Sequence, residues 1–337
     1  MALNKVMGWA VALGLTCAAG PALADITIYS GQHKAGTDAV AKAFTEKTGI
    51  QVNVKKGSSE QMAGQLAEEG ERTPADVFWA EQTSPMLMLS QKGLLVKLPE
   101  NVVQAMHGEG YDAVPKAENQ DWVATSGRAR VVAYNPDLIK EEELATSVLD
   151  YAKPEWKGRI GFVPTSGAFL EQIIGMTDML DEETALNWLL GLKDNGKQYA
   201  KNSVALAAVE RGEIPAALIN NYYWHNMVRE QGGLDKVKSR LNFIGHEDPG
   251  AMMTYATIAV LNGSDNQDEA VKFVEYAVSQ EGQQAFANER AEYPLRADVQ
   301  SSFDLKPYKE IGAPKTSVTT FEDKEKAARL LEKAGLK

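Results

Sequence analysis

The chain has 337 residues, of which 44% are hydrophobic and 24% are charged, as in an ordinary globular protein with a sizeable core. This length exceeds one typical domain, and we expect two domains of roughly 150 residues each. The 46 acidic and 35 basic residues give a net charge of −11. Such an acidic chain argues against nucleic acid as a partner, because nucleic-acid binding depends on neutralising phosphates.

The first residues, 1–24, differ in composition from the rest of the chain. Lys5 supplies a positive charge, residues 6–20 are nearly all apolar or small, and Ala22-Leu23-Ala24 fits the small-x-small cleavage pattern. We predict a secretory signal peptide that is cleaved after Ala24. An uncleaved membrane anchor is disfavoured because the apolar run is short for a span of about 20 residues. Cys17 is the only cysteine, so the exported chain would have no disulfide and no thiolate metal site.

Strand and helix patterns alternate over the next part of the chain. The predicted elements are strand 25–29, helix 37–48, strand 50–54, helix 58–70 and strand 76–79. Gly49 and Gly70 end the two helices, because glycine adopts the backbone conformations that follow a helix. This order is typical of βαβ units with a parallel sheet.

The middle of the chain contains a candidate crossing point between domains. A helix is predicted at 86–95, whereas residues 101–120 are polar and have no pattern that we assign. Residues 122–124 and 130–134 have strand patterns and flank Ser126-Gly127-Arg128. We predict a pair of strands here, with the glycine where the chain passes from one domain to the other.

A second α/β set follows this crossing point. Its predicted elements are strand 159–163, helices 169–179 and 184–192, strands 216–219, 242–244 and 253–261, and helices 269–279, 282–287 and 324–334. The two sets predict two α/β lobes, and a cleft between such lobes is a natural ligand site. We assign residues 25–125 and 253–305 to an N-terminal lobe, and residues 126–252 and 306–337 to a C-terminal lobe.

Two tyrosines stand directly after the strand predicted at 216–219. Tyr222 and Tyr223 belong to the motif Asn220–His225, and ligands of open α/β sheets bind where strands end. A phenol loses its proton only near pH ~10, but a bound trivalent cation is a large enough charge to remove it earlier. The alternative is a pair of half-buried aromatic residues whose hydroxyls are hydrogen-bonded.

Other strand exits carry residues that suit the same chemistry. His33 follows the first strand and Glu81 follows the third, so one imidazole and one carboxylate join the two phenols. Hard cations prefer oxygen ligands, and one histidine among three anionic oxygens, without any thiol, suits Fe³⁺ better than Zn²⁺ or Cu⁺. Two phenolates and one carboxylate also balance the three charges of a ferric ion.

An anion site is predicted beside these four residues. Ser166-Gly167-Ala168 opens a helix, and a helix N-terminus offers free N–H groups and the positive end of a dipole. Four protein ligands leave two positions of an octahedron open, so a phosphate or carbonate held there would complete the shell of the metal. Asn202 and Asn220 add side-chain donors.

Together these segments resemble the periplasmic ferric-ion-binding proteins, which are transferrin-like proteins of bacterial iron ABC transporters. The resemblance covers essentially the whole chain after residue 24, and the segments that carry it are Tyr29–His33, Ala80–Gln82, Pro164–Phe169, Asn220–His225 and Arg290–Leu295. It implies an α/β, bilobal fold of the type II periplasmic binding proteins, with two α/β domains joined by crossing strands and a cleft between them.

The resemblance also implies a function and a set of partners. The expected function is capture of Fe³⁺ with a synergistic phosphate or carbonate anion in the periplasm, without catalysis. The expected partners are an upstream ferric donor and an inner-membrane ABC transporter permease, and the chain is expected to be a monomer that does not bind nucleic acid.

Residue by residue, the metal ligands of that family match His33, Glu81, Tyr222 and Tyr223. The positions that hold its anion match Ser166, Gly167, Ala168, Asn202 and Asn220. Gln82 is expected to hydrogen-bond around the metal ligands. Arg290 either lies near the anion or forms a structural salt bridge.

Two other functions are consistent with some of these residues. A binding protein for an organic cation or small anion could use the same fold, with Trp79 and Trp224 caging an amine through cation–π contacts. A non-haem Fe³⁺ oxygenase also uses tyrosine and histidine ligands. The sequence supplies neither an acid–base relay nor an organic-substrate pocket for such an enzyme.

Overall fold

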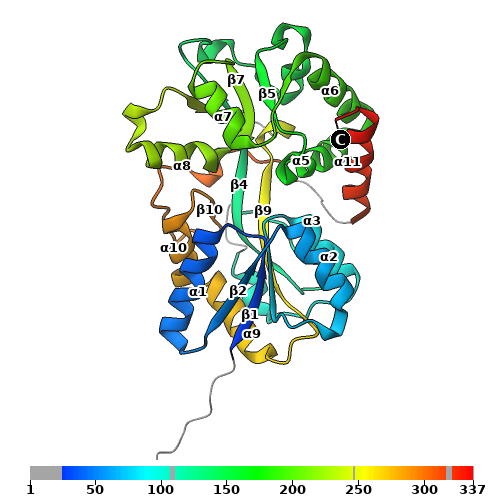
Figure 1. The fold of residues 1–337 in the computed structure, drawn as a ribbon, viewed down its shortest axis with the longest axis vertical. Coiled ribbons are helices and arrows are strands. Elements are labelled where there is room, and N and C mark those ends of the chain that lie inside the picture. The colour runs from blue at the N-terminus through cyan, green and yellow to red at the C-terminus, as the bar shows by residue number, and fades with distance from the viewer. Residues whose placement is uncertain (1–24, 107–110, 246, 316–320, 337) are drawn as a thin grey trace, which may run out of the picture.

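Two lobes lie one above the other, and two long strands, β4 and β9, run between them (Figure 1). The computed structural model describes residues 25–106, 111–245, 247–315 and 321–336. The predicted signal peptide, residues 1–24, and its cleavage site lie outside the described residues. No helix in the described part of the chain is long and apolar enough to cross a membrane.

The N-terminal lobe is built on a mixed sheet in the order β2-β1-β3-β9-β4. Its strands are β1 (Ile26–Ser30), β2 (Val52–Lys56), β3 (Val77–Ala80), β9 (Met253–Val260) and the first part of β4 (Val123–Tyr134). The predicted parallel arrangement is confirmed for β1, β2 and β3. β9 lies antiparallel to both β3 and β4, so the returning chain closes this sheet.

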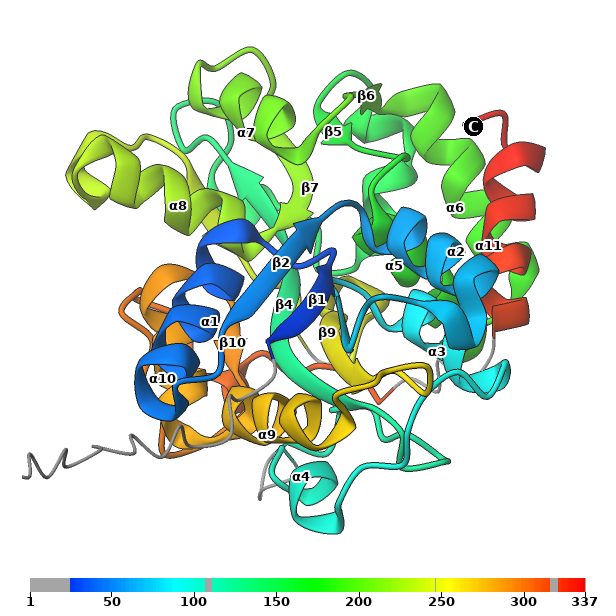
Figure 2. The ribbon, with the colours of Figure 1, turned by 60° about the horizontal axis from the view of Figure 1, so that its bottom comes forward.

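Helices cover both faces of this sheet, as Figure 2 shows with α1 to one side and α2 and α3 to the other. They are α1 (Lys34–Thr48), α2 (Ser59–Glu69), α3 (Thr83–Gln91), α4 (Glu100–Gln104), α9 (Gln267–Val278) and α10 (Gln280–Glu289). Gly49 ends α1 with a φ of 80°, as predicted from the glycine. Ser58 and Gln61 form a capping box at the start of α2.

The prediction of a helix at 86–95 is wrong in its bounds, because α3 starts at Thr83 and ends at Gln91. Its first turn is made of small polar residues and Pro85, which are common at helix starts but interrupt an apolar pattern. Gly93, with a φ of 68°, then prevents the helix from continuing to Leu95.

The prediction of two separate strands around Gly127 is also wrong, because residues 123–134 form the single buried strand β4. A register shift between Ala124 and Ser126 lets the strand bend without ending. Residues 123–129 pair with β9, and residues 130–134 pair with β7 (Ala216–Asn220) of the other lobe. The chain does pass between the lobes here, within one strand.

The C-terminal lobe continues the sheet in the order β4-β7-β5-β6. β5 (Ile160–Phe162) is parallel to β6 (Lys197–Gln198) and to β7, while β8 (Arg240–Asn242) pairs with β4. The short β10 (Tyr293–Pro294) pairs with β4 near Gly127. The helices of this lobe are α5 (Gly167–Met179), α6 (Glu182–Asn195), α7 (Asn202–Glu210), α8 (Asn221–Gln231) and α11 (Phe321–Lys333).

The final helix α11 lies beside helices of the C-terminal lobe. It packs against α5 and α6 at the side of the lobe (Figure 1), where Ala327, Leu330 and Leu331 are buried. One group of buried residues continues along β4 from the first lobe into β7 and α7. The lobe boundaries assigned at residues 125 and 252 therefore stay a prediction.

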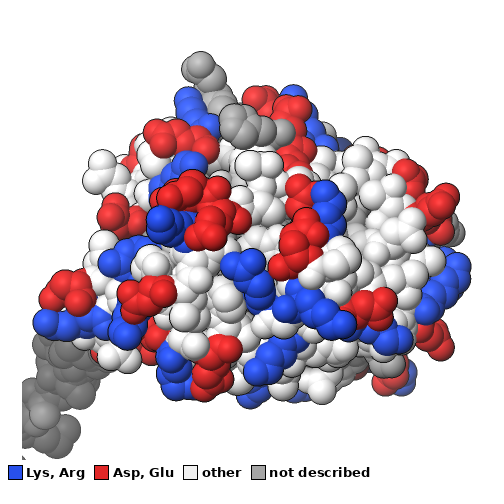
Figure 3. Space-filling model, turned by 90° about the horizontal axis from the view of Figure 1, so that it is seen from above, with Lys and Arg blue, Asp and Glu red and all other residues white. Residues whose placement is uncertain are grey.

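Acidic and basic side chains are interspersed on the face seen from above, over the C-terminal lobe (Figure 3). The net charge of −11 is thus not gathered into one acidic patch on that face.

Strand order places a ligand site between the lobes. β1 lies between β2 and β3, so the connection from β1 to β2 and the connection from β2 to β3 run in opposite directions, and β5 lies likewise between β6 and β7. Ligands of α/β sheets bind beyond the carboxyl ends of strands at such switch points. These ends carry His33 and Glu81 in one lobe, and Ser166 and Asn220 in the other.

Candidate metal centre between the lobes

The N-terminal lobe contributes His33 and Glu81 to the candidate site. His33 lies between β1 and α1, and Glu81 follows β3. Because β1 and β3 are adjacent and parallel, their ends meet at one edge of the sheet. The His33 Nε2 atom lies 3.3 Å from Glu81 Oε1, so the structure brings these two predicted residues together.

A buried arginine that the sequence analysis did not assign to the site holds Glu81. The Arg128 side chain is inaccessible to solvent, and its Nη1 lies 2.6 Å from Glu81 Oε1 while its Nη2 donates to the Glu81 carbonyl oxygen. Burial alone would raise the pKa of Glu81, but Arg128 and His33 outweigh it and lower the pKa to about 2. Glu81 is therefore a charged carboxylate at any physiological pH.

The C-terminal lobe contributes Tyr222 and Tyr223 from the first turn of α8. Their ring centroids are 4.2 Å apart, and the Tyr222 ring lies 5.0 Å from the imidazole ring of His33. Burial, and then the charges of Glu81 and Tyr223, raise the pKa of Tyr222 well above its usual value. Without a metal this phenol keeps its proton, and only a strongly charged cation would ionise it.

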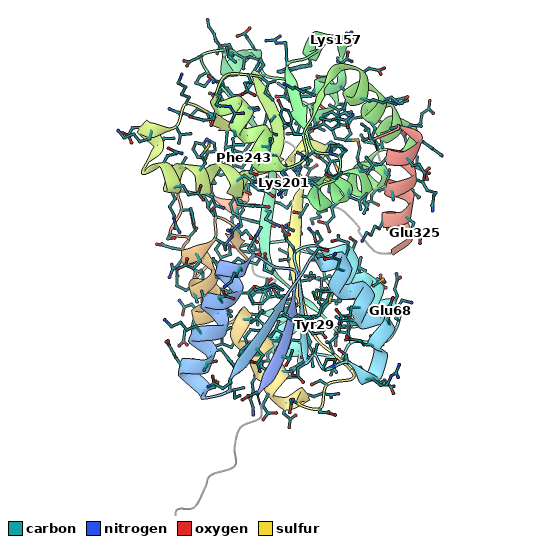
Figure 4. All side chains as sticks on the ribbon, in the orientation of Figure 1. Tyr29, Glu68, Lys157, Lys201, Phe243 and Glu325 are labelled. Carbon is teal, nitrogen blue, oxygen red and sulfur yellow. The ribbon has the colours of Figure 1, made fainter. Side chains whose placement is uncertain are left out.

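Three helix N-termini converge next to the tyrosines. They belong to α5, α7 and α8, and the residues before them, Ser166, Lys201 and Asn220, do not cap these helices with their side chains. Lys201 lies on the face of the upper lobe that is turned to the lower lobe (Figure 4). Free N–H groups at three helix ends make this region suitable for an anion.

These helix ends and the tyrosines share one cavity of about 320 Å³. It is lined by Glu81, Gln82, Val163, Thr165, Ser166, Gly167, Ala168, Ala200, Lys201, Asn202, Ser203, Asn220, Tyr222 and Tyr223. Eight of the nine predicted site residues are in this lining, and His33 borders the cavity through its contacts with Glu81 and Tyr222.

The two predicted asparagines are oriented by their neighbours. Arg130, which the sequence analysis also did not assign, is buried and donates to Asn220 Oδ1 at 2.7 Å. The amide nitrogen of Asn220 therefore remains to donate to an anion. Burial lowers the pKa of Arg130 to about 10, so it stays charged. Asn202 Nδ2 donates to Ser166 Oγ at 3.3 Å, which links α7 to the start of α5.

Gln82 reaches across to the opposite lobe. A Cβ atom placed on Gly167 would lie 2.7 Å from Gln82 Nε2, so the absence of a side chain on Gly167 permits this close approach. Among the described residues, the buried atoms His33 Nε2, Gln82 Oε1 and Asn202 Oδ1 have no hydrogen-bond partner. Buried polar atoms are normally paired, so these three suit a bound ion and its anion.

Arg290 has a neighbour that fits each of its two interpretations, a position near the anion and a structural salt bridge. Its Cζ lies 5.4 Å from the centre of the Tyr222 ring, and its Nε lies 3.8 Å from the buried Glu292. It is not among the residues that line the anion cavity. The salt-bridge interpretation therefore fits better.

The structure argues against an amine cage. Trp79 is buried and donates to Thr125, and Trp224 donates to the Ser239 carbonyl, so neither indole lines the cavity. No group of three His, Cys, Asp or Glu suited to a metal occurs in the described part of the chain. The candidate metal site thus depends on the two tyrosines.

Comparison with known proteins places the chain in a family. Residues 30–284 match the family of bacterial extracellular solute-binding proteins. The chain is 54% identical over 320 residues to the major ferric iron-binding protein of Neisseria meningitidis serogroup A, covering 95% of this chain and 96% of that protein. Iron-bound HitA from Pseudomonas aeruginosa has a similar structure, with a TM-score of 0.83 and 43% identity over 93% of this chain and 98% of HitA.

A more distant structure shares the fold. Apo ferric ion-binding protein A of Pasteurella haemolytica is 22% identical, with a TM-score of 0.79 over 93% of this chain and 98% of that one. These similarities confirm the predicted bilobal α/β architecture. The chain belongs to the bacterial extracellular solute-binding proteins, and within them to the group of the ferric iron-binding proteins.

Proposed function

We propose that this protein captures a ferric ion and a small anion between its lobes and delivers the ion to an ABC transporter. The observation that carries the proposal is the meeting of His33 and Glu81 from one lobe with Tyr222 and Tyr223 from the other. The names of its relatives in Neisseria, Serratia and Pseudomonas, which include ferric or Fe³⁺ binding and bound iron, support the same ligand.

Charge balance favours a trivalent ion over a divalent one. Glu81 is already anionic because Arg128 stabilises its charge, while burial keeps Tyr222 a neutral phenol. Removing protons from two phenols in a buried site is unfavourable unless the bound ion carries a large charge. Fe³⁺ meets this requirement, and its preference for hard oxygen ligands matches three of the four side chains.

The anion would be a phosphate or carbonate at the three helix N-termini. Ser166, Gly167 and Ala168 offer the start of α5, and Asn202 and Asn220 flank it from α7 and β7. Such an anion would lie beside the tyrosines, where it would fill the remaining positions around the metal and offset the positive ends of three dipoles.

Capture and closure would be coupled through the two lobes. An ion that contacts both lobes only when they are closed shifts the population to the closed form. The protein would act as a carrier rather than an enzyme, in the periplasm after cleavage of its signal peptide. Release to the transporter would require opening of the lobes.

An absorbance titration tests this function. Iron-free protein is titrated with ferric citrate, with and without added phosphate, and the visible tyrosinate–iron band is followed. We expect saturation at one ferric ion per chain and loss of the band in the double variant Tyr222→Phe, Tyr223→Phe. A colourless mixture, or a band that persists in the double variant, would overturn the proposal.

The same samples separate the alternatives. An oxygenase would show the band but would also consume O₂ when an aromatic substrate is added, whereas a carrier would not. A protein for organic cations or small anions would bind its ligand without any visible band.

A further inference from the structure

The Arg-Ala-Glu-Tyr-Pro segment at 290–294 resembles the ferric-binding family, yet the proposed site assigns it no role. It precedes and forms β10, which pairs with β4 at Ser126 and Gly127. Glu292 is the only carboxylate of this segment, and its side chain is inaccessible to solvent. A fully buried carboxylate is rare unless its charge is paired with another group.

The two carboxylate oxygens of Glu292 have different surroundings. Oε2 accepts two hydrogen bonds, from Ser126 Oγ at 2.6 Å and from Gln32 Nε2 at 3.3 Å. Oε1 is buried and has no hydrogen-bond donor among the described residues. It lies 3.8 Å from His33 Nε2 and 3.8 Å from Arg290 Nε. One oxygen is thus anchored while the other faces a predicted metal ligand.

The same network holds the backbone of His33. Gln32, whose amide nitrogen donates to Glu292, accepts from the His33 backbone nitrogen through Oε1 at 2.7 Å. Ser126 lies on β4, the strand that passes between the lobes. Glu292 therefore connects His33 to the crossing strand, both through Gln32 and through its own free oxygen.

We propose that Glu292 is a positioning residue of the ferric site. Its anchored carboxylate holds the His33 imidazole towards Glu81 and Tyr222, and its charge offsets Arg290, whose guanidinium lies over the Tyr222 ring. This inference rests on the proposed function. Residues that orient metal ligands are worth about 10- to 100-fold in metal affinity when changed.

The test is a double-mutant cycle between Glu292→Gln and His33→Ala. Apparent ferric affinity is measured by competition with citrate, using the visible tyrosinate–iron band. We expect Glu292→Gln alone to weaken binding about 10- to 100-fold, and to have an effect of less than about 3-fold when His33 is already alanine. An equal loss in both backgrounds, or no loss in the parent, would overturn the inference.

A matched control is Glu210→Gln. The Glu210 carboxylate also accepts from a serine hydroxyl at 2.6 Å, that of Ser239, but it does not line the cavity. Its change should leave ferric affinity as in the parent, and an equal loss there would overturn the inference by showing an unspecific effect of losing such a bond. Thermal unfolding of each iron-free variant shows that the fold is retained.

A second variant carries the test if Glu292→Gln does not fold. Ser126→Ala keeps the charge of Glu292 and its bond from Gln32 but removes the shorter of its two anchoring bonds, so we expect a smaller loss of affinity that also disappears in the His33→Ala background. A loss that persists there contradicts the inference. Failure of the parent protein itself to develop the band would refute the proposed function instead, so the two failures are distinguishable.

Discussion

Replacing Arg128 by methionine should change how the free energy of unfolding of the iron-free protein depends on pH. In the folded parent, Glu81 has a pKa of about 2 against an ordinary 4.5, with Arg128 the largest stabilising influence. A lowered pKa stabilises the folded state above pH 4.5, and this stabilisation is lost as the pH falls through 2. The shift from 4.5 to about 2 corresponds to about 3 kcal/mol.

Methionine keeps much of the apolar stem of the arginine but removes its charge. Burial then opposes the charge of Glu81 with only His33 and Arg290 left to favour it, so its pKa rises and the charged carboxylate is less favourable in the fold near neutral pH. Removing one partner of a buried ion pair costs about 3–5 kcal/mol. We expect a loss in that range at pH 7 that becomes smaller as the pH falls, because protonated Glu81 no longer needs the guanidinium.

The assay is urea unfolding of iron-free parent and variant, followed by far-UV circular dichroism at several pH values between 2.5 and 7. Arg240→Met is the matched control, because in the described part of the chain Arg240 donates to the carbonyls of Val237, Lys238 and Ser239 and forms no ion pair with a carboxylate. The loss of stability in Arg240→Met should be the same at every pH. If the difference between parent and Arg128→Met is also the same at every pH, the account of Glu81 is wrong.

Two further predictions concern the tyrosines and Glu171. Tyr222→Phe or Tyr223→Phe should weaken ferric binding more than His33→Ala does, because each removes an anionic ligand from a trivalent ion. Competition with citrate measures the ferric affinities. Equal losses of affinity in the three variants would contradict the ranking. Glu171 accepts from the Thr83 backbone nitrogen at 2.9 Å, and burial raises its pKa to about 7. A raised pKa lowers the free energy of unfolding as the pH rises from 4.5 to 7. In urea unfolding, Glu171→Gln should therefore gain stability relative to the parent over that pH range. A difference between variant and parent that is the same at every pH would refute this.

Local patterns in the sequence were sufficient for most of the elements. The alternation at 25–29 and the glycine at 49 depend only on neighbours in the chain, and both predict the observed structure. Tyr222 and His33 were found in the same way, since each stands directly after an apolar strand. Their meeting in space follows from the strand order.

Local patterns did not identify the residues that contact these candidate site residues. Arg128 contacts Glu81 across 47 positions of the chain, Arg130 contacts Asn220 across 90, and Ser126 contacts Glu292 across 166. The available signal was the occurrence of two arginines in a run that is otherwise apolar or small. Buried charges in a strand require partners, and that requirement points to the site even where the partners remain unknown.

Unpaired polar atoms in the cavity between the lobes explain why closure of the lobes would depend on a bound ion. Gln82 Oε1 and Asn202 Oδ1 are shielded from water without hydrogen-bond partners among the described residues, and each such group costs about 1–3 kcal/mol. Together these two groups disfavour an empty closed state by roughly 2–6 kcal/mol, whereas about 5.5 kcal/mol converts a population from 1:99 to 99:1. Bonds between the lobes, such as those from Thr83 to Glu171 and from Arg229 to Asn288, oppose this penalty. A ferric ion and its anion would relieve the penalty by pairing these groups, so the same atoms that favour opening of the empty protein would couple closure to binding.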